Sequence, residues 1–113
     1  SRVGLVDRRI RRSVELMHAQ LDQELSLKAL AAASFLSPFH FSRLFKKLTG
    51  STPHNYLAIM RANRAQLLLA ETEMSVTEIG ARVGYLSASH FTKAFRLATG
   101  TTPREFRKAL IRG

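Results

Sequence analysis

Two stretches of this sequence repeat one another fifty residues apart. The first reads SPFHFSRLFKKLTGSTP over residues 37–53, and the second reads SASHFTKAFRLATGTTP over residues 87–103. Aligned over residues 35–57 and 85–107, the two segments share nine identical residues. Two copies are too few for a stacked solenoid, so each copy is expected to form a unit with a small core of its own.

The residues that begin and end local structure predict helices and no strands. Small hydroxyl residues stand at six N-cap positions: Ser26, Ser37, Thr52, Ser75, Ser87 and Thr102. Pro38, Pro53 and Pro103 occupy first helical positions, and Gly50 and Gly100 stand where left-handed C-terminal caps belong. No stretch of useful length alternates with period two. We therefore predict an all-α fold of seven helices, at residues 6–21, 27–33, 38–49, 53–71, 76–83, 88–99 and 103–111.

The chain is predicted to be a single domain built from two helix-turn-helix subdomains. The first subdomain is expected over residues 5–51, a linker helix over 52–72 and the second subdomain over 73–113. With 113 residues, 45% of them hydrophobic, the chain can bury a core. It begins with Ser rather than Met and no apolar signal stretch follows, so a domain from a longer protein is expected.

The repeated helix has two contrasting faces. Apolar residues at helical spacing predict core faces in the two copies: Phe41, Leu44, Phe45 and Leu48, and Phe91, Ala94, Phe95 and Ala98. The opposite stripes carry basic residues and no acid: Phe39, Ser42, Arg43 and Lys46, and Ser89, Thr92, Lys93 and Arg96. An ordinary solvated helix face mixes both signs of charge. Two acid-free faces therefore indicate a polyanionic partner.

Charge along the whole chain agrees with this interpretation. Lys and Arg number 18 against 8 Asp and Glu, which gives a formal net charge of +10. No acidic residue occurs over residues 25–70 or 79–104. Such a field favours nucleic acid or an anionic membrane surface. A bilayer-spanning segment is excluded because the longest apolar runs are too short.

A short helix precedes each repeated helix, which is the arrangement of a helix-turn-helix unit. Ala31 and Ala32, or Gly80 and Ala81, are expected to let the two helices cross closely. The second helix of such a unit fits the major groove, with its first residues at base edges. A linker helix of about 18 residues rises about 27 Å, so two recognition helices about 34 Å apart could read successive grooves.

The first predicted helix carries an apolar stripe and a basic run. Val6, Ile10, Val14, Met17 and Leu21 recur at helical spacing and are expected to pack the first copy. The run Arg8, Arg9, Arg11 and Arg12 is interpreted as a solvated face or a contact with a missing region, with phosphate contact as the alternative.

Several other functions find little support in the sequence. The absence of cysteine excludes a disulfide framework, a thiolate zinc site and a cysteine nucleophile, and fits a cytoplasmic protein. The four histidines show no metal-ligand spacing, and Glu71 and Glu73 are interpreted as solvated rather than as an acid/base pair. We expect no enzyme activity and no cofactor. A non-specific architectural nucleic-acid binder or a membrane-surface helical protein remains the alternative.

The segments LSLKALAAASFLSPFHFSRLFKKLTGSTP and SVTEIGARVGYLSASHFTKAFRLATGTTPREFR resemble the DNA-binding domain of the AraC/XylS family of bacterial transcription regulators. The resemblance runs from about residue 25 to 107. It implies a sequence-specific regulator whose recognition helices, 38–49 and 88–99, enter successive major grooves of promoter DNA. It also implies RNA polymerase as a partner, and a small-molecule effector that acts only through a separate domain.

The resemblance also implies roles for individual residues. Base reading falls to Phe39, Ser42 and Arg43 in the first unit, and to Ala88, Ser89, His90 and Lys93 in the second. Phosphate contact falls to Ser37, Lys46, Lys47, Arg61, Arg64, Ser87, Thr92 and Arg96. Packing over the subdomain core is the alternative for Phe39, and packing is the favoured interpretation for His40 and His90 on their own pattern.

One residue departs from the family pattern. Phe35 stands in the first turn, where the family usually has Gly, whereas the second turn has Gly84 and one additional residue. A Phe side chain resists the left-handed conformation that such a turn favours. Docking of the first unit is therefore less securely predicted than docking of the second.

Overall fold

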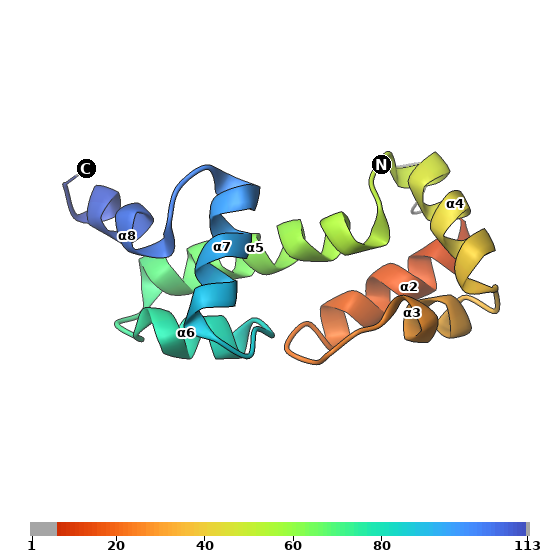
Figure 1. The fold of residues 1–113 in the computed structure, drawn as a ribbon, viewed down its shortest axis with the longest axis horizontal. Coiled ribbons are helices and arrows are strands. Elements are labelled where there is room, and N and C mark those ends of the chain that lie inside the picture. The colour runs from red at the N-terminus through yellow and green to blue at the C-terminus, as the bar shows by residue number, and fades with distance from the viewer. Residues whose placement is uncertain (1–6, 113) are drawn as a thin grey trace. The chain divides into compact units, whose positions relative to one another are not determined.

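The computed structural model of the chain describes residues 7–112, which form seven helices and no strand (Figure 1). In chain order they are α2 (Arg8–Ala19), α3 (Leu27–Ala33), α4 (Pro38–Thr49), α5 (Pro53–Glu71), α6 (Val76–Arg82), α7 (Ala88–Thr99) and α8 (Pro103–Arg112). The all-α prediction is confirmed. The bounds of α3, α4, α5 and α7 are those that the capping residues predicted.

The other three helices differ from prediction at their ends. α2 begins at Arg8 because the Asp7 carboxylate accepts hydrogen bonds from the backbone N–H groups of Arg9 and Ile10, at 2.9 and 3.3 Å. It ends at Ala19 because Gln20 leaves the helical region, with φ −123° and ψ 38°. Residue 6, the predicted start, lies outside the described residues. α6 ends one residue earlier than predicted, and α8 continues one residue further.

All six predicted N-caps form. Each hydroxyl accepts a hydrogen bond from the backbone N–H three residues later, at 3.0 to 3.2 Å. At Ser75 and Thr102 the carboxylate of Glu78 or Glu105 also accepts from the backbone N–H of the cap residue, which completes a capping box. These backbone donors lower the pKa of both carboxyl groups. Sequence spacing therefore fixes the helix starts.

The chain divides into two compact units, Ser1–Leu57 and Ala58–Gly113, with the boundary inside α5. We call them unit 1 and unit 2 and describe each by itself. In unit 1, α3 packs against both α2 and α4. Phe45 contacts Tyr56 edge to face, with 5.3 Å between ring centroids. The buried apolar side chains of unit 1 include Ile10, Val14, Met17, Leu30, Ala31, Phe41, Phe45 and Leu57.

The turn between α3 and α4 has an unusual backbone. Phe35 adopts a left-handed conformation with φ 59°, and the turn closes through hydrogen bonds from Phe35 N–H to the Ala32 carbonyl and from Leu36 N–H to the Ala31 carbonyl. In unit 2 the corresponding residue is Gly84, with φ 101°. Phe35 therefore adopts the left-handed conformation that its side chain was expected to disfavour, because the hydrogen bonds of the turn hold it there.

The contacts of the Phe35 side chain stabilise the protein by less than its left-handed backbone conformation costs. A left-handed conformation costs an L-residue about 1 to 2 kcal/mol. Phe35 is 79% exposed, so burial contributes little. Its one recorded partner within residues 7–112 is the Arg12 guanidinium, whose central carbon lies 5.2 Å from the ring centroid. Such a contact at an exposed site stabilises by about 0.5 to 1 kcal/mol, which does not offset the backbone cost.

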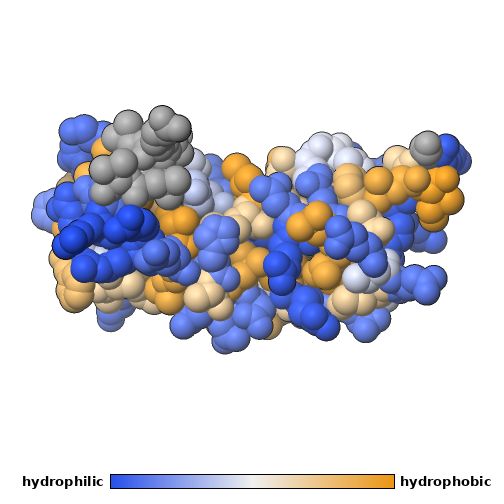
Figure 2. Space-filling model, turned by 180° about the vertical axis from the view of Figure 1, so that it is seen from behind, coloured by the Kyte–Doolittle hydropathy of each residue, from blue (hydrophilic) through white to orange (hydrophobic). Residues whose placement is uncertain are grey.

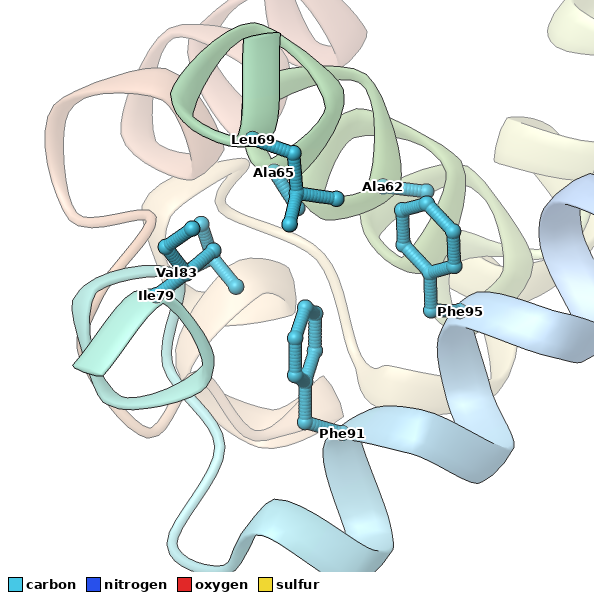
Figure 3. Close-up of a cluster of buried hydrophobic side chains, with 7 residues drawn as sticks. All are labelled: Ala62, Ala65, Leu69, Ile79, Val83, Phe91 and Phe95. Atoms are coloured by element: carbon cyan, nitrogen blue, oxygen red, sulfur yellow. The ribbon is translucent and has the colours of Figure 1, made fainter. Parts of the chain in front are cut away.

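Unit 2 has a core of seven buried side chains contributed by three helices (Figure 3). α5 contributes Ala62, Ala65 and Leu69; the segment of α6 and its cap contributes Ile79 and Val83; α7 contributes Phe91 and Phe95. The two phenylalanines confirm the predicted core face of α7. Ala98, predicted on the same face, is exposed because it lies in the last turn of α7, one turn beyond the packed interface.

Close crossing of α6 and α7 depends on Gly80. A Cβ atom at this position would lie 2.9 Å from Cγ and Cδ2 of Phe91. In the other predicted crossing, Ala31 is buried, whereas Ala32 and Ala81 are exposed and take no part in the packing. Only one small residue of each predicted pair therefore lies in the helix contact.

Replacing Gly80 by Ala is expected to destabilise unit 2. Alanine favours a helix by about 1 kcal/mol over glycine, but the added methyl overpacks the Phe91 ring at a cost of about 1 to 3 kcal/mol. A net loss of about 1 kcal/mol in the free energy of unfolding follows, measured by denaturant titration. The exposed neighbour serves as control: Ala81→Gly reports the propensity alone. Stabilisation by Gly80→Ala would contradict the close crossing.

Arg107 joins α8 to the end of α5. Its guanidinium donates three hydrogen bonds to backbone carbonyl oxygens: Nε to Leu69 at 3.2 Å, Nη2 to Thr72 at 3.2 Å and Nη1 to Met74 at 2.6 Å. These carbonyls lie at the end of α5 and in the segment before α6, where intrahelical partners run out. The Arg107 side chain therefore links α8 to the end of α5 and pairs carbonyl oxygens that apolar packing alone would leave without a hydrogen-bond donor.

Candidate nucleic-acid interface

The exposed face of α4 carries the predicted base-reading residues of unit 1. Burial of Phe41 and Phe45 fixes the rotation of the helix and turns the opposite side outward. Phe39 is 64% exposed, so most of its surface faces solvent, which disfavours the alternative that its ring packs over the core. The guanidinium carbon of Arg43 lies 5.5 Å from the centroid of the Phe39 ring. An exposed aromatic ring and a stacked guanidinium thus stand together in the first half of α4.

The other predicted contacts of unit 1 are placed along the same helix. Lys46 and Lys47 are exposed in its last turn, and Ser42 is half-buried. The Ser37 hydroxyl caps the helix and also lies 2.8 Å from Nδ1 of His40. When that nitrogen carries the hydrogen of this contact, the hydroxyl proton is free to bind an external oxygen.

The corresponding face of α7 is concave. Seven residues line an open depression of about 710 Å³: Ala88, Ser89, Thr92, Lys93, Arg96, Leu97 and Gly100. Five of these are predicted site residues, so the structure brings most of the unit 2 set together. Sequence reasoning missed Leu97, which is 82% exposed. The internal repeat could have identified it, because Leu97 aligns with Lys47, a predicted phosphate contact of the first copy.

His90 and Ser87 lie at the start of α7. The Ser87 hydroxyl accepts from the His90 backbone N–H at 3.1 Å. The exposed His90 ring contacts Tyr85 edge to face, with 5.2 Å between centroids. The predicted packing role of His90 thus has a partner in the turn, and its exposed edge remains accessible.

The two arginines of α5 that are predicted phosphate contacts differ in their exposure. Arg64 is exposed, but Arg61 is half-buried with its guanidinium carbon 5.3 Å from the centroid of the Tyr85 ring. Burial raises the pKa of the Tyr85 hydroxyl, although the charge and hydrogen bond of Arg61 act to lower it. The contact of Arg61 with Tyr85 could not be predicted from helical periodicity, because the ring lies 24 residues away in the sequence.

The electrostatics of both faces are unbalanced. No ion pair joins a basic side chain of α4 or α7 to a carboxylate within the described part of the chain, whereas Arg9 pairs with Asp7 at 3.1 Å. Figure 2 shows hydrophilic side chains across the face it displays, with hydrophobic surface in separate patches. A cationic surface whose basic side chains form no ion pairs attracts polyanions.

The structure offers no metal-binding constellation over residues 7–112, since no group of three or more His, Cys, Asp or Glu side chains is close enough. In the same part of the chain, no helix has the length and apolar character needed to cross a bilayer.

Comparison with known proteins gives a consistent result. A family model described as a helix-turn-helix domain matches residues 30–109. The HTH-type transcriptional regulator YobQ of Bacillus subtilis is 35% identical over 72 residues, which are 64% of this chain and 30% of YobQ. The bifunctional transcriptional activator and DNA repair enzyme Ada of Escherichia coli is 44% identical over 61 residues, 52% of this chain and 17% of Ada. The chain thus spans less than a third of these relatives.

Two solved structures match over most of their length. A transcriptional regulator from Chromobacterium violaceum, with an AraC-type DNA-binding domain, is 34% identical with a TM-score of 0.81, and the match covers 90% of this chain and 91% of that one. The DNA-binding domain of AdpA, solved in complex with a target DNA, is 32% identical with a TM-score of 0.83, covering 88% and 89%. This chain therefore belongs to the family of AraC-type helix-turn-helix DNA-binding domains.

Proposed function

We propose that the chain is the sequence-specific DNA-binding part of a bacterial transcription regulator, with α4 and α7 as its recognition helices. The observation that carries the proposal is the pair of exposed, cationic faces on α4 and α7, each backed by two buried phenylalanines. The same helix, oriented by the same kind of core, occurs in both units. The major groove accepts an α-helix and presents base edges to its first turns.

Base reading belongs to the first half of each recognition helix. In unit 1 the residues are Phe39, Ser42 and Arg43; in unit 2 they are Ala88, Ser89, His90 and Lys93. Arg43 and Lys93 have the donors to bond O6 and N7 of guanine, and an exposed ring such as Phe39 suits the methyl group of thymine. The Phe39 ring restricts the Arg43 guanidinium before DNA arrives, which lowers the entropy that binding must remove.

Phosphate contacts fix the position of each unit on DNA without reading sequence. Cations suited to them are Lys46 and Lys47 on α4, Arg96 on α7, and Arg61 and Arg64 on α5. Arg61 fits this role less freely than the others, since the Tyr85 ring already holds its guanidinium. Ser37, Ser87 and Thr92 add hydroxyl donors near the helix starts.

One duplex with two recognition blocks, about ten base pairs apart, is the DNA that this duplicated domain suits. A promoter is the natural setting for such a site in a regulator. RNA polymerase then becomes a partner, and an effector would act through a part of the protein beyond this domain. The chain acts by binding rather than by catalysis, needs no cofactor, and works in the bacterial cytoplasm, where the chromosome lies.

Selection of bound duplexes from a random pool tests the proposal. A recovered motif with two blocks about ten base pairs apart is expected. The selected duplex should bind about a thousandfold or more tighter than random DNA. An architectural protein would enrich no motif and show little preference. Preferential binding to anionic vesicles in competition with duplex DNA would favour a membrane-surface protein.

Single substitutions separate base reading from phosphate contact. Arg43→Ala and Lys93→Ala are each expected to cost about 1 to 3 kcal/mol on the selected duplex and to relax the preference at one base pair. Lys47→Ala is the control, an exposed cation expected to weaken all sequences alike. Repeating the selection with each variant is the measurement. Identical motifs and losses for all three variants would remove the base-reading assignment.

A further inference from the structure

Each unit holds an arginine of its first helix against an aromatic ring in its helix-turn-helix turn. In unit 1, Arg12 of α2 lies over Phe35, with 5.2 Å from the guanidinium carbon to the ring centroid. In unit 2, Arg61 of α5 lies over Tyr85, at 5.3 Å. The duplication therefore extends beyond the repeated helix to a stacked arginine beside each turn.

In unit 1 a single residue provides both the left-handed backbone and the aromatic ring, whereas unit 2 uses two residues. In unit 2, Gly84 takes the left-handed backbone and the next residue, Tyr85, supplies the ring. In unit 1, Phe35 does both, with φ 59° and a ring that is mostly exposed. Neither burial nor the contact with Arg12 offsets this strain in the free protein, as argued above. A strained, exposed residue that the fold does not require points to a role in binding.

We propose that Arg12 is a DNA phosphate contact of unit 1 and that Phe35 is its positioning residue. The proposal rests on the function proposed above. It takes up, for Arg12 alone, the phosphate contact that the sequence offered only as an alternative for the basic run of α2. Arg12 would then correspond in unit 2 to Arg61, the arginine over the ring of the other turn.

The position of the stacked pair favours the DNA backbone. Phe35 lies two residues before Ser37, the N-cap of α4, so it is within about 7 Å of the helix end that carries Phe39. The buried Ser34 hydroxyl keeps α2 at this turn, since it lies 2.9 Å from the Arg9 carbonyl oxygen and 3.0 Å from that of Leu30. A helix end that enters the major groove passes between phosphates.

The chemistry of Arg12 also suits a phosphate. Within residues 7–112 no carboxylate pairs with its guanidinium, whereas Arg9, three residues earlier, is paired with Asp7. A guanidinium stacked on a ring keeps its N–H groups at the edge of its plane, where they can bind two phosphate oxygens together. Restricting the side chain beforehand removes part of the entropy loss on binding.

Neutral phosphates test the contact directly. Methylphosphonates are placed one at a time along the selected duplex, and affinity is measured by fluorescence anisotropy for the unmodified chain, Arg12→Ala and Arg11→Ala. Arg11 is an exposed arginine of the same helix without a ring partner. One phosphate beside the unit 1 block should matter to the unmodified chain and to Arg11→Ala but not to Arg12→Ala. Arg12→Ala should also make the plot of log affinity against log salt less steep by about 0.9.

Substitutions of Phe35 test its positioning role. Phe35→Gly is expected to weaken binding about 2- to 10-fold while thermal stability is kept or raised. Phe35→Tyr keeps the ring and should keep the affinity, and the double variant Arg12→Ala/Phe35→Gly should bind no worse than Arg12→Ala. A methylphosphonate profile identical for the unmodified chain and Arg12→Ala, or equal salt slopes, overturns the proposal, as does equal loss in Arg11→Ala. Absence of any preferred duplex would instead refute the proposed function.

Discussion

Raising the salt concentration from 50 to 200 mM is expected to lower the affinity of the chain for its selected duplex by about 1,000- to 100,000-fold, the loss typical of six to ten phosphate contacts. The reason is the release of ions condensed on DNA when basic side chains replace them. Exposed basic residues on α4 and α7 form no ion pair with a carboxylate in the described structure, so their charge is available to DNA. The loss should be largely independent of sequence.

Anisotropy titrations at four or more salt concentrations give the measurement. Log affinity plotted against log salt should be linear with a slope of roughly −5 to −9. The double variant Lys46→Ala/Lys47→Ala provides an internal control, because removing two phosphate contacts should make the slope less steep by about 2. An affinity that hardly responds to salt would contradict the electrostatic basis of the interface.

Replacing Phe91 by Ala is expected to lower the free energy of unfolding of unit 2 by about 3 to 5 kcal/mol. The Phe91 ring contacts Phe95 and Tyr85 at 5.8 and 5.7 Å between centroids, and α6 approaches it through Gly80. Removing the ring leaves a cavity between α6 and α7 that these neighbours fill only in part. Small domains have about 5 to 15 kcal/mol in total, so unit 2 would be close to unfolding.

Denaturant titration followed by circular dichroism measures this loss. Leu97→Ala is the matched control, because Leu97 lies on the same helix but is exposed, and a change within about 0.5 kcal/mol is expected. Because each unit has its own core, unfolding of the Phe91→Ala variant should become biphasic, with unit 1 melting later. A single transition shifted by less than about 1 kcal/mol would show that the Phe91 contacts contribute little.

Local structure could be predicted from the sequence because its causes are local. A capping hydroxyl bonds a backbone N–H three residues later, so Ser26, Ser37 and Ser87 fixed the starts of three helices without knowledge of the fold. The paired phenylalanines of α4 and α7 were identified as core from helical spacing alone. The exposed faces followed as the complement of these core faces.

Contacts between segments far apart in the sequence could not be predicted. Arg61 reaches Tyr85, and Arg107 reaches carbonyls more than thirty residues away, because tertiary packing brings α5, α6 and α8 together. Helical periodicity describes which side of one helix is apolar, and it contains no information about which turn a long arginine side chain will meet. Leu97 could have been predicted, since it aligns with Lys47 in the internal repeat. It was missed because an apolar residue is not expected in a cationic interface.

Arg107 shows that the number of basic residues in a sequence includes side chains that bind the protein itself as well as side chains that are available to a ligand. Its guanidinium donates three hydrogen bonds to backbone carbonyl oxygens of unit 2, so this positive charge stabilises the fold. Arg9 is likewise occupied by its own neighbour, Asp7. Proteins of similar formal charge can therefore differ widely in their affinity for a polyanion, because they differ in how many arginines are already bound to groups of the protein itself.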